Sequence, residues 1–497
     1  MAGPPGLPPG FGLALDCATR RLDRGRTLIG GTPLRVLRLG APGAAALDAM
    51  EDGTPIGPEP SIGRFARRLV DAGLAHPIPP PPVDAPPTVT VVIPVRDRSS
   101  GLAATLAALG TDTPVVVVDD GSNPHEAIRT AAAAARHGAA LVRRPAPGGP
   151  AAARNSGWRA SSSELVAFID ADCVPAPGWL AGLVAHFQDP LVAAVAPRIV
   201  STAAPGSPAV LAAYEQVRSP LDRGLAPGPV RPRGRVPYVP SAALIVRRPD
   251  LVALDGFDEG MQVGEDVDLV WRLDDAARRV RYVPEVTVAH PARASWAAWL
   301  QQRIAYGRSA AGLDARHPGA VAPLTVSGWS AAAWWLGTLV HPVPGAALAA
   351  ITTAMLPAKL GALDHPWRES LRLAGIGHLW AGRSIADALR RAWWPAVVVG
   401  ALTSPRVRRV AVAAALLPAG LEWVSERPPV DLGRWVVLRL VDDLAYGWGV
   451  WAGCLRAGRF DALRPDLAGW PRRESSVGPG GTPMVRSLAE PTRLEAI

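Results

Sequence analysis

The chain has 497 residues, a length at which several domains are expected rather than a single core. Its formal net charge is +9, but nearly all of its 52 basic residues are arginines and it has no aromatic-studded basic module of the RNA-binding kind, so we expect no nucleic-acid partner. An anionic membrane surface or a phosphate-bearing substrate accounts for the charge better. The three cysteines, Cys17, Cys173 and Cys454, lie far apart in the sequence, which supports neither a zinc site nor a disulfide framework and fits a reducing cytoplasm.

Residues 1–76 are predicted to form a small N-terminal domain. Residues 27–40 read as strand and turn, a helix start follows in 41–53, and apolar residues at helical spacing predict a helix in 61–77. The tract PIPPPPVDAPP, residues 77–87, is typical of a stiff extended linker, so we place a domain boundary there.

Residues 88–318 alternate between strand-like and helix-like segments, which predicts one α/β domain. The expected elements are, in chain order, strand 88–95, helix 99–110, strand 113–122, helix 126–138, strand 140–145, helix 153–163, strand 164–172, strand 236–248, a loop entering a helix in 256–280, strand 280–291 and helix 294–313. Such alternation indicates a parallel sheet with right-handed crossovers. Ligands of these sheets bind beyond the carboxyl ends of the strands.

Two pairs of carboxylates fall at such strand ends. Asp119 and Asp120 end VVVVDDGS, and Asp170 and Asp172 end AFIDAD. Residues i and i+2 of a strand share a face, so the second pair should project together, and a hard divalent cation would relieve its repulsion. Acids at strand ends are also common turn formers, and an Asx turn is the alternative for one residue of the first pair. Together the two pairs indicate one cleft.

Residues 319–470 are predicted to form a hydrophobic helical region that holds most of the 17 tryptophans. Residues 323–358 contain no Asp, Glu, Lys or Arg, enough for a spanning helix of ~20 residues, but His341 and Pro342 interrupt the run. Apolar runs flanked by Trp and Arg are typical of a membrane interface, so we expect this region at the cytoplasmic face of the cell membrane, peripheral or with few spanning helices. A buried helical domain of a soluble protein is the alternative. Residues 471–497 are expected to be disordered.

Six motifs between residues 89 and 310 resemble those of the family 2 glycosyltransferases, which have the GT-A fold and use nucleotide sugars. The motifs are, in the family's order, VVIPV, VVVVDDGS, GGPAAARNSG, FIDADCVPAPGWL, GEDVDLVWRL and YVPEVTVAHP. The resemblance implies a Rossmann-like, mostly parallel sheet flanked by helices. It also implies a UDP-sugar donor, a divalent metal (Mn or Mg) and hexose transfer with inversion.

The resemblance also implies roles for individual residues. Nucleotide-sugar binding is implied for Pro94, Asp119, Asp120, Arg154, Asn155, Asp170 and Ala171. Metal binding is implied for Asp170, Asp172 and His290, and catalysis for Asp266, as base toward the acceptor hydroxyl, and for Glu265, which would hold a second acceptor hydroxyl. Asp268 reads instead as a helix-start charge, and Trp179 and Trp271 as sugar-stacking or core residues.

One departure from the family concerns processivity. Members that make long polymers carry a QxxRW motif, whereas this chain reads QQRIAYGRS, with Gln302 and Arg303 but no Arg-Trp pair. We therefore expect the transfer of one or a limited number of sugars.

The whole chain is also similar to the glycosyltransferases that act in mycofactocin biosynthesis in actinobacteria, on the segments LIGGTPLRVLRL and RSAAGLDARHPGAVAPL. This resemblance implies UDP-glucose as donor and β-1,4 oligoglucosylation of a peptide-derived redox cofactor precursor. Residues 40–53 and 65–77 are similar to winged-helix peptide-binding modules of the pyrroloquinoline-quinone chaperone type, which would make residues 1–76 a module that presents the peptide-derived acceptor. A small packing domain without a ligand is the alternative.

Two other functions remain open from the sequence. One keeps the enzyme and changes the acceptor to a glycolipid or cell-envelope polysaccharide. The other is a catalytically inactive peptide-binding protein. The retained set Asp170, Asp172, Asp266 and His290 argues against the inactive protein, because clustered charges lower stability and are typical of functional sites.

Overall fold

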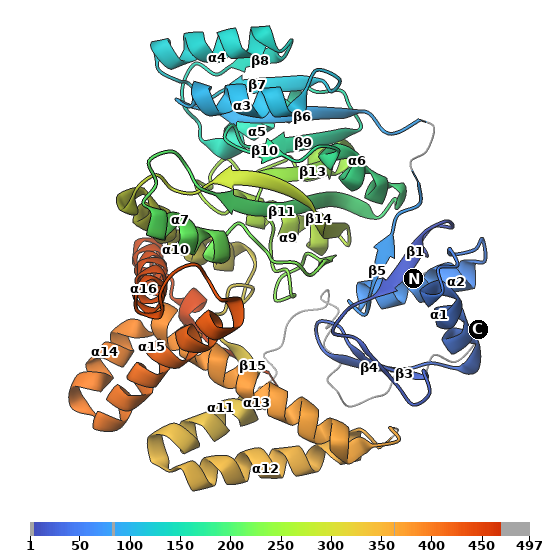
Figure 1. The fold of residues 1–497 in the computed structure, drawn as a ribbon, viewed down its shortest axis with the longest axis vertical. Coiled ribbons are helices and arrows are strands. Elements are labelled where there is room, and N and C mark those ends of the chain that lie inside the picture. Colours follow the sequence, from blue (N-terminus) through green and yellow to red (C-terminus); the bar gives the residue numbers. More distant parts are fainter. Residues whose placement is uncertain (1–3, 82–84, 362, 469–497) are drawn as a thin grey trace. The chain divides into compact units, whose positions relative to one another are not determined.

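The computed structural model describes residues 4–81, 85–361 and 363–468 of the chain. Figure 1 labels its helices and strands where there is room. Two compact units are present: the first consists of Met1–Thr19, Gly30–Pro33 and Ala45–Trp299, and the second of Arg20–Ile29, Leu34–Ala44 and Leu300–Ile497. The tail expected to be disordered, residues 471–497, lies outside the described residues.

The first unit is built around a sheet of nine strands. In spatial order they run β10-β14-β11-β13-β9-β6-β7-β8, with β12 added beside β14. Their bounds are β6 Val89–Val95, β7 Val115–Asp119, β8 Ala140–Arg143, β9 Leu165–Ile169, β10 Val174–Pro175, β11 Val192–Thr202, β12 Gly228–Pro229, β13 Ala243–Arg247 and β14 Arg279–Pro291. The inner strands β6, β7 and β9 are rich in buried Val and Ile, which suits a sheet covered on both faces.

The direction of the strands is mixed. β9, β6, β7 and β8 are parallel, as predicted, and β11 is parallel to β14. β13 runs antiparallel to both β9 and β11. The strand predicted for 236–248 forms only from Ala243, after Pro237 and Pro240, because proline has no N–H for a sheet ladder.

Helices cover this sheet, and several predicted site residues lie at or near the starts of these helices. They are α3 Ser99–Leu109, α4 Pro124–Arg136, α5 Pro150–Arg159, α6 Trp179–Val184, α7 Ala209–Arg218, α8 Arg248–Ala253 and α9 Glu265–Asp275. α9 begins after Gly264, which has a φ of +89°, and its first turn carries three acids, a placement that the helix dipole stabilises. Its inner face buries Leu269 and Leu273.

The N-terminal region contributes to both units. In the first, β1 Gly12–Leu15 pairs antiparallel with β5 Ala75–Ile78, beside α2 Pro60–Asp71. In the second, β2 Arg20–Leu22, β3 Thr27–Gly30 and β4 Arg35–Arg38 form a three-stranded sheet. α1 Ala41–Glu51 follows β4.

Ion pairs fix α2 to the amino ends of two strands of the large sheet. Arg67 lies 2.7 Å from Asp189, which precedes β11, and both side chains are buried. Asp71 accepts two hydrogen bonds from the guanidinium of Arg279, the first residue of β14, at 2.9 and 2.8 Å. His290 lies near the other end of β14, so the N-terminal region docks at the end of the sheet opposite the predicted metal site.

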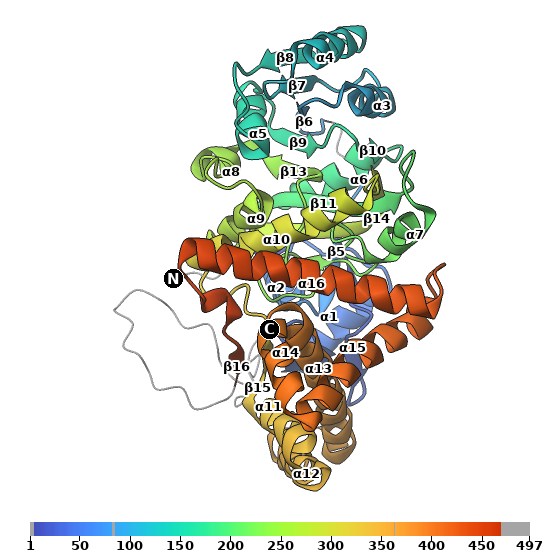
Figure 2. The same cartoon turned by 90° about the vertical axis from the view of Figure 1, so that its left-hand side faces the viewer.

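The second unit is largely helical. Its helices are α10 Trp296–Arg316, which begins in the first unit, α11 Gly328–Trp335, α12 Pro342–Lys359, α13 Pro366–Arg391, α14 Trp394–Thr403, α15 Pro405–Glu426 and α16 Leu432–Ala457. β15 Thr325–Ser327 and β16 Asp466–Ala468 form a short parallel pair. Figure 2 shows α11 and α12, and likewise α14 and α15, as neighbouring helices.

The uncharged run 323–358 does not form one helix. It folds back at a π-helical turn, Leu336–Val340, and at the extended residue His341, and Gly337 and Gly345 let the two helices touch. Among the described residues, no helix combines the length and the apolar character needed to cross a membrane.

The helical unit has a charged core. Arg439 lies 2.8 Å from Glu422 and 3.0 Å from Asp443, and Arg390 lies 2.9 Å from Asp443, all four buried. These pairs join α13, α15 and α16. Removing one partner of a buried ion pair typically lowers the free energy of unfolding by about 3–5 kcal/mol. The network therefore fixes how these three helices pack.

Candidate functional site

Asp170 and Asp172 lie in a turn rather than on a strand. β9 ends at Ile169, and the N–H of Cys173 donates to the carbonyl of Asp170 at 3.0 Å, which closes the turn. The carbonyl of Ala171 in this turn accepts the hydroxyl of Thr105 at 3.0 Å. The alternation expected for a strand therefore does not apply, and the two carboxylates take separate partners.

Each carboxylate of the turn pairs with its own arginine. Asp170 Oδ1 lies 2.8 Å from Arg154 Nη2, and Asp172 Oδ2 lies 2.6 Å from Arg98 Nη1. Arg154 belongs to α5, whereas Arg98 immediately precedes α3. Each acid of the turn thus has a guanidinium group beside it that offsets its negative charge.

A candidate cation site lies on the other side of Asp172. Ligand atoms of Asp172, Cys173 and His290 all lie within 4.8 Å of one another, and His290 Nε2 is 3.7 Å from Asp172 Oδ1. Burial and nearby carboxylates raise the pKa of the Cys173 thiol well above its usual range, so it stays protonated and is a poor ligand. The remaining carboxylate and imidazole fit a cation such as Mn²⁺ better than a thiolate-bound Zn²⁺. Asp170 is not in this group.

The predicted base lies at the start of α9 and is oriented by backbone donors. Asp266 accepts the N–H of Ser241 at 3.1 Å and that of Val267 at 2.8 Å. Its neighbour Glu265 accepts from Arg154 Nη1 at 2.8 Å. Arg154 therefore bridges the start of α9 and the Asp170 turn with one buried guanidinium.

The two acids at the start of α9 hold protons more tightly than ordinary carboxylic acids. Burial, with the charge of Asp266, raises the pKa of Glu265 to about 7. Burial also raises the pKa of Asp266, against the opposing effect of Arg154. Two adjacent acids beside one guanidinium can hold a proton near neutral pH, which suits proton transfer.

Asp119 and Asp120 both accept hydrogen bonds from backbone N–H groups, Asp119 within its own loop and Asp120 from a distant one. Asp119 accepts the N–H of Ser122 at 2.9 Å, which is the Asx turn considered above for one of the pair. Asp120 accepts the N–H groups of Gly148 and Gly149 at 2.9 and 2.8 Å. Asp120 thereby fixes the glycine pair immediately before α5, the helix that carries Arg154.

Asn155 is buried and satisfied within the protein. Its amide nitrogen donates to the carbonyl of Phe257 at 2.7 Å and to Glu259 at 2.9 Å, and its oxygen accepts the N–H of Phe257 and the indole N–H of Trp158, both at 2.9 Å. These bonds attach α5 to the loop before α9. This placement gives Asn155 a clear structural task next to the predicted ligand site.

The other sequence-predicted residues have simpler surroundings. Pro94 lies in β6, opposite Val118 of β7. Asp268 pairs with Arg272 at 2.7 Å within α9. Trp179 and Trp271 are buried, as a core role requires, and Trp271 donates to the carbonyl of Pro237.

Sequence reasoning missed three contributors to the site. Arg98 follows VVIPV at the carboxyl end of a predicted strand, where ligands bind, and that position was the available signal. Cys173 follows the acids directly but resembles any small buried residue. Ser241 contributes only its backbone N–H, which the sequence does not identify.

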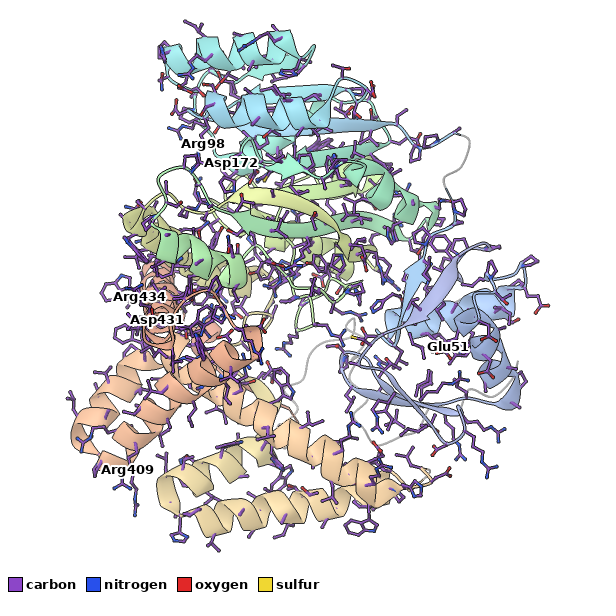
Figure 3. The ribbon with its side chains drawn as sticks, viewed as in Figure 1. Glu51, Arg98, Asp172, Arg409, Asp431 and Arg434 are labelled. Carbon is purple, nitrogen blue, oxygen red and sulfur yellow. The ribbon has the colours of Figure 1, made fainter. Side chains whose placement is uncertain are left out.

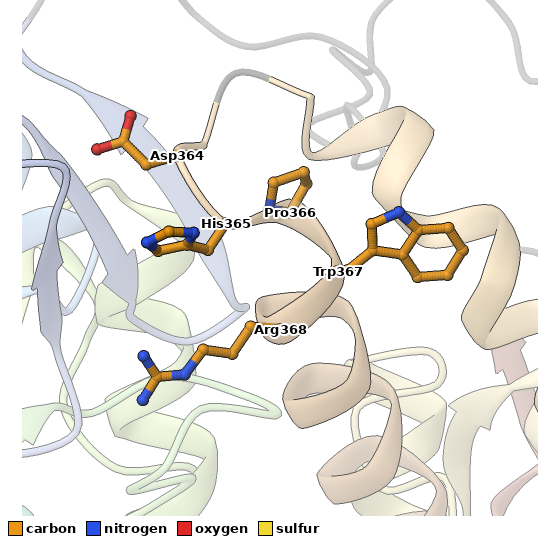
Figure 4. Close-up of a pocket in the computed structure, with 5 residues that line it drawn as sticks. All are labelled: Asp364, His365, Pro366, Trp367 and Arg368. Carbon is orange, nitrogen blue, oxygen red and sulfur yellow. The ribbon is translucent and has the colours of Figure 1, made fainter.

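A separate surface pocket of about 440 Å³ belongs to the second unit. Figure 4 shows its lining residues, Asp364, His365, Pro366, Trp367 and Arg368. None of the residues predicted from the motifs lines it, so it is not the site described above.

Comparison with known proteins agrees with the motifs. The family model described as glycosyl transferase family 2 matches residues 90–220, and that described as glycosyl transferase family group 2 matches residues 165–400. The pre-mycofactocin glycosyltransferase of Mycobacterium tuberculosis (strain ATCC 25618 / H37Rv) is 40% identical over 473 residues, which cover 93% of this chain and 98% of that protein.

A solved mannosyltransferase from Pyrobaculum calidifontis, in complex with GDP-Man and Mn²⁺, is 21% identical with a TM-score of 0.36 and covers 60% of this chain and 90% of its own. The α/β fold of the GT-A class predicted from the motifs is confirmed. Because a full-length relative shares 40% of its residues and the family models match the site-bearing segments, this chain belongs to the family 2 glycosyltransferases that include the pre-mycofactocin glycosyltransferase.

Proposed function

We propose that this enzyme is an inverting, cation-dependent hexosyltransferase that transfers glucose from UDP-glucose, in β-1,4 linkage, to the peptide-derived precursor of mycofactocin. One observation carries the proposal. The Arg154 guanidinium lies 2.8 Å from both Asp170 and Glu265, so it joins the donor-side turn to the helix that begins with the predicted base. A donor and an acceptor hydroxyl bound at this junction would meet between the two motifs.

In this proposal Asp266 accepts the proton of the acceptor hydroxyl as its oxygen attacks the anomeric carbon. The N–H groups of Ser241 and Val267 hold the carboxylate in one orientation, and each of its oxygens keeps a free lone pair for the proton. Its raised pKa makes it a stronger base than an exposed aspartate. Attack opposite the departing UDP inverts the anomeric configuration.

The donor side of the site would hold a divalent cation at Asp172 and His290, with Asp170 as the third ligand implied by the motif. A bound Mn²⁺ or Mg²⁺ would neutralise charge on the diphosphate leaving group. Arg154 keeps Asp170 in place from the protein side.

We expect Asp172→Ala to weaken Mn²⁺-dependent UDP binding at least about tenfold, because it removes the only carboxylate of the Asp172, Cys173 and His290 group. Isothermal titration calorimetry with and without Mn²⁺ measures this effect. Asp112→Ala, at an exposed acid outside the site, is the control. Equal Mn²⁺ dependence in Asp172→Ala and in the unaltered protein would contradict the metal assignment.

The proposed acceptor is tested with purified protein, Mn²⁺, UDP-glucose and the peptide-derived precursor, followed by mass spectrometry. A ladder of hexose additions supports the proposal. UDP-galactose in place of UDP-glucose tests the donor sugar, and lipid acceptors test the cell-envelope alternative. Absence of transfer to any acceptor, with UDP binding intact, would favour the inactive peptide-binding protein.

A peptide-binding role for the N-terminal region must account for its distance from the site. Arg279, which pairs with Asp71 of α2, and His290 are eleven residues apart on β14, or up to roughly 36 Å at about 3.3 Å per residue. We propose that a peptide held there reaches the cleft through an extended segment rather than by direct contact.

We also propose peripheral binding of the helical unit to the cytoplasmic membrane surface. Its helices expose many large apolar side chains, including Trp335, Trp380, Val399, Leu402, Leu417 and Leu421. Exposed arginines, among them Arg409 labelled in Figure 3, lie at the start of α15, which contacts α14, and they suit anionic headgroups. Binding to the membrane through this surface would also suit the alternative in which the acceptor is lipid-linked.

We expect Val399→Asp with Leu402→Asp to reduce flotation with vesicles of anionic lipid at least about tenfold, because each buried apolar side chain contributes about 1.5–3 kcal/mol. Both side chains are more than half exposed on α14. Ile128→Asp, at an equally exposed apolar residue on α4 of the other unit, is the matched control. If the double variant floats with the vesicles as well as the control does, the proposal that this surface binds the membrane is wrong.

A further inference from the structure

Arg98 is a counter-ion of Asp172. Its Nη1 lies 2.6 Å from Asp172 Oδ2, and both side chains are labelled in Figure 3. The other oxygen of the same carboxylate, Oδ1, faces His290 Nε2 at 3.7 Å. One carboxylate therefore lies between an arginine and the candidate cation site.

The two arginines at this turn differ in how firmly they are held. The Arg154 side chain is 5% exposed and bonds two carboxylates, so it cannot leave without uncovering buried charge. The Arg98 side chain is 56% exposed, and Asp172 is its sole hydrogen-bond partner among the described residues. Because the Arg98 guanidinium stays solvated while the Asp172 side chain is only 17% exposed, the arginine can leave the pair without uncovering a buried charge of its own. Only Arg98 is free to exchange partners.

A divalent cation and a guanidinium compete for Asp172. Both carry positive charge, and at one carboxylate they repel each other. Arg98 precedes α3 at the carboxyl end of β6, the edge of the sheet at which nucleotides bind. A guanidinium released from Asp172 would lie at the edge where the donor diphosphate is proposed to bind. It could bind the diphosphate oxygens through two parallel N–H groups.

We propose that Arg98 is an exchangeable counter-ion, which neutralises Asp172 in the free protein and transfers to the diphosphate of the nucleotide sugar once Asp172 binds a divalent cation. The inference rests on the proposed function of the Asp172 site. It predicts that loss of the Arg98 charge has opposite effects on the two ligands. The cation binds more tightly because its competitor is gone, and the nucleotide binds more weakly because a phosphate partner is gone.

The test compares Arg98→Gln with Arg96→Gln, a control at an exposed arginine of the same loop that does not contact Asp172. Mn²⁺ binding without nucleotide is measured from the electron paramagnetic resonance signal of free Mn²⁺. UDP binding at saturating Mn²⁺ is measured by calorimetry. For Arg98→Gln we expect Mn²⁺ affinity to rise about three- to tenfold and UDP affinity to fall about tenfold. Arg96→Gln should leave both constants unchanged.

Each result has a distinct meaning. A weaker UDP complex with unchanged Mn²⁺ affinity would make Arg98 an ordinary phosphate ligand and overturn the exchange. Tighter Mn²⁺ with unchanged UDP affinity would overturn the transfer to the diphosphate. If the unaltered protein itself binds no Mn²⁺ with or without UDP, the proposed cation-dependent function fails, and the exchange fails with it. Arg98→Lys, which keeps the charge, should restore the Mn²⁺ constant more fully than the UDP constant, because an ammonium lacks the planar pair of donors.

Discussion

Asp266→Asn is expected to lower kcat by about 10²–10⁴-fold while UDP binding stays near that of the unaltered enzyme. The substitution keeps the size of the side chain and one oxygen acceptor for the N–H of Val267, but an amide takes no proton from the acceptor hydroxyl. The donor side, at Asp170 and Asp172, is untouched. Single-turnover transfer of hexose and calorimetric UDP binding measure the two effects separately.

The same variant carries a second, independent signature. The charge of Asp266 raises the pKa of Glu265, so its removal should bring that pKa below its present value of about 7. Titration of the Glu265 carboxyl by NMR detects the change. Asp275→Asn, at the exposed end of α9, should alter neither kcat nor this pKa. A large loss of UDP affinity in Asp266→Asn would show that the residue belongs to the donor site instead.

The local patterns of the sequence predicted the parallel half of the fold well, because each strand there is a short apolar run ended by a turn signal. β6, β7 and β9 are of this kind. The antiparallel strand β13 was predicted too long because proline before it removes ladder donors. β11 received no prediction although its eleven residues are mostly buried, since a long apolar run does not by itself distinguish strand from helix.

Partners of charged residues could not be predicted, since they depend on segments far apart in the chain. Arg154 and Glu265 are 111 residues apart, and Arg98 and Asp172 are 74 apart. Motifs name the residues at a site, but the fold decides which of them meet. Asn155 illustrates this limit, because its motif position suggests a ligand contact and its hydrogen bonds are instead filled by the loop before α9.

The position at which the N-terminal region attaches to the large sheet could not be predicted from the sequence either. Its similarity to peptide-binding modules suggests that it delivers the acceptor, whereas Arg67 and Asp71 attach it to the amino ends of β11 and β14. The residues proposed to hold the metal and to act as base lie toward the opposite end of the sheet, where the parallel strands place their carboxyl termini. A delivery role therefore requires a long flexible acceptor.

Arg154→Met is expected to have the largest combined effect on stability and activity. The substitution keeps an unbranched apolar chain in a buried position but leaves Asp170 and Glu265 without their common counter-ion. Breaking a buried pair in this way typically costs about 3–5 kcal/mol in the free energy of unfolding. Chemical denaturation at several pH values measures the loss, and Arg159→Met, at the exposed end of the same helix, is the control.

The pH dependence of this loss has a definite sign. Arg154 lowers the pKa of both Glu265 and Asp266 against the effect of burial, so its removal raises both further. A carboxyl whose pKa is higher in the folded than in the unfolded protein destabilises the fold as pH rises from its ordinary value, 4.5 for Glu265, through its folded value of about 7. The deficit of Arg154→Met should therefore be small near pH 5 and largest above pH 7.

Catalysis should shift in the same direction. Asp266 must be unprotonated to act as base, so the acid limb of the kcat/KM profile should move to higher pH in Arg154→Met. A lower rate with an unmoved acid limb would mean that Arg154 only holds the two motifs together. Movement of the limb together with the loss of stability would show that the one guanidinium both joins the donor and acceptor sides and keeps the base ionised.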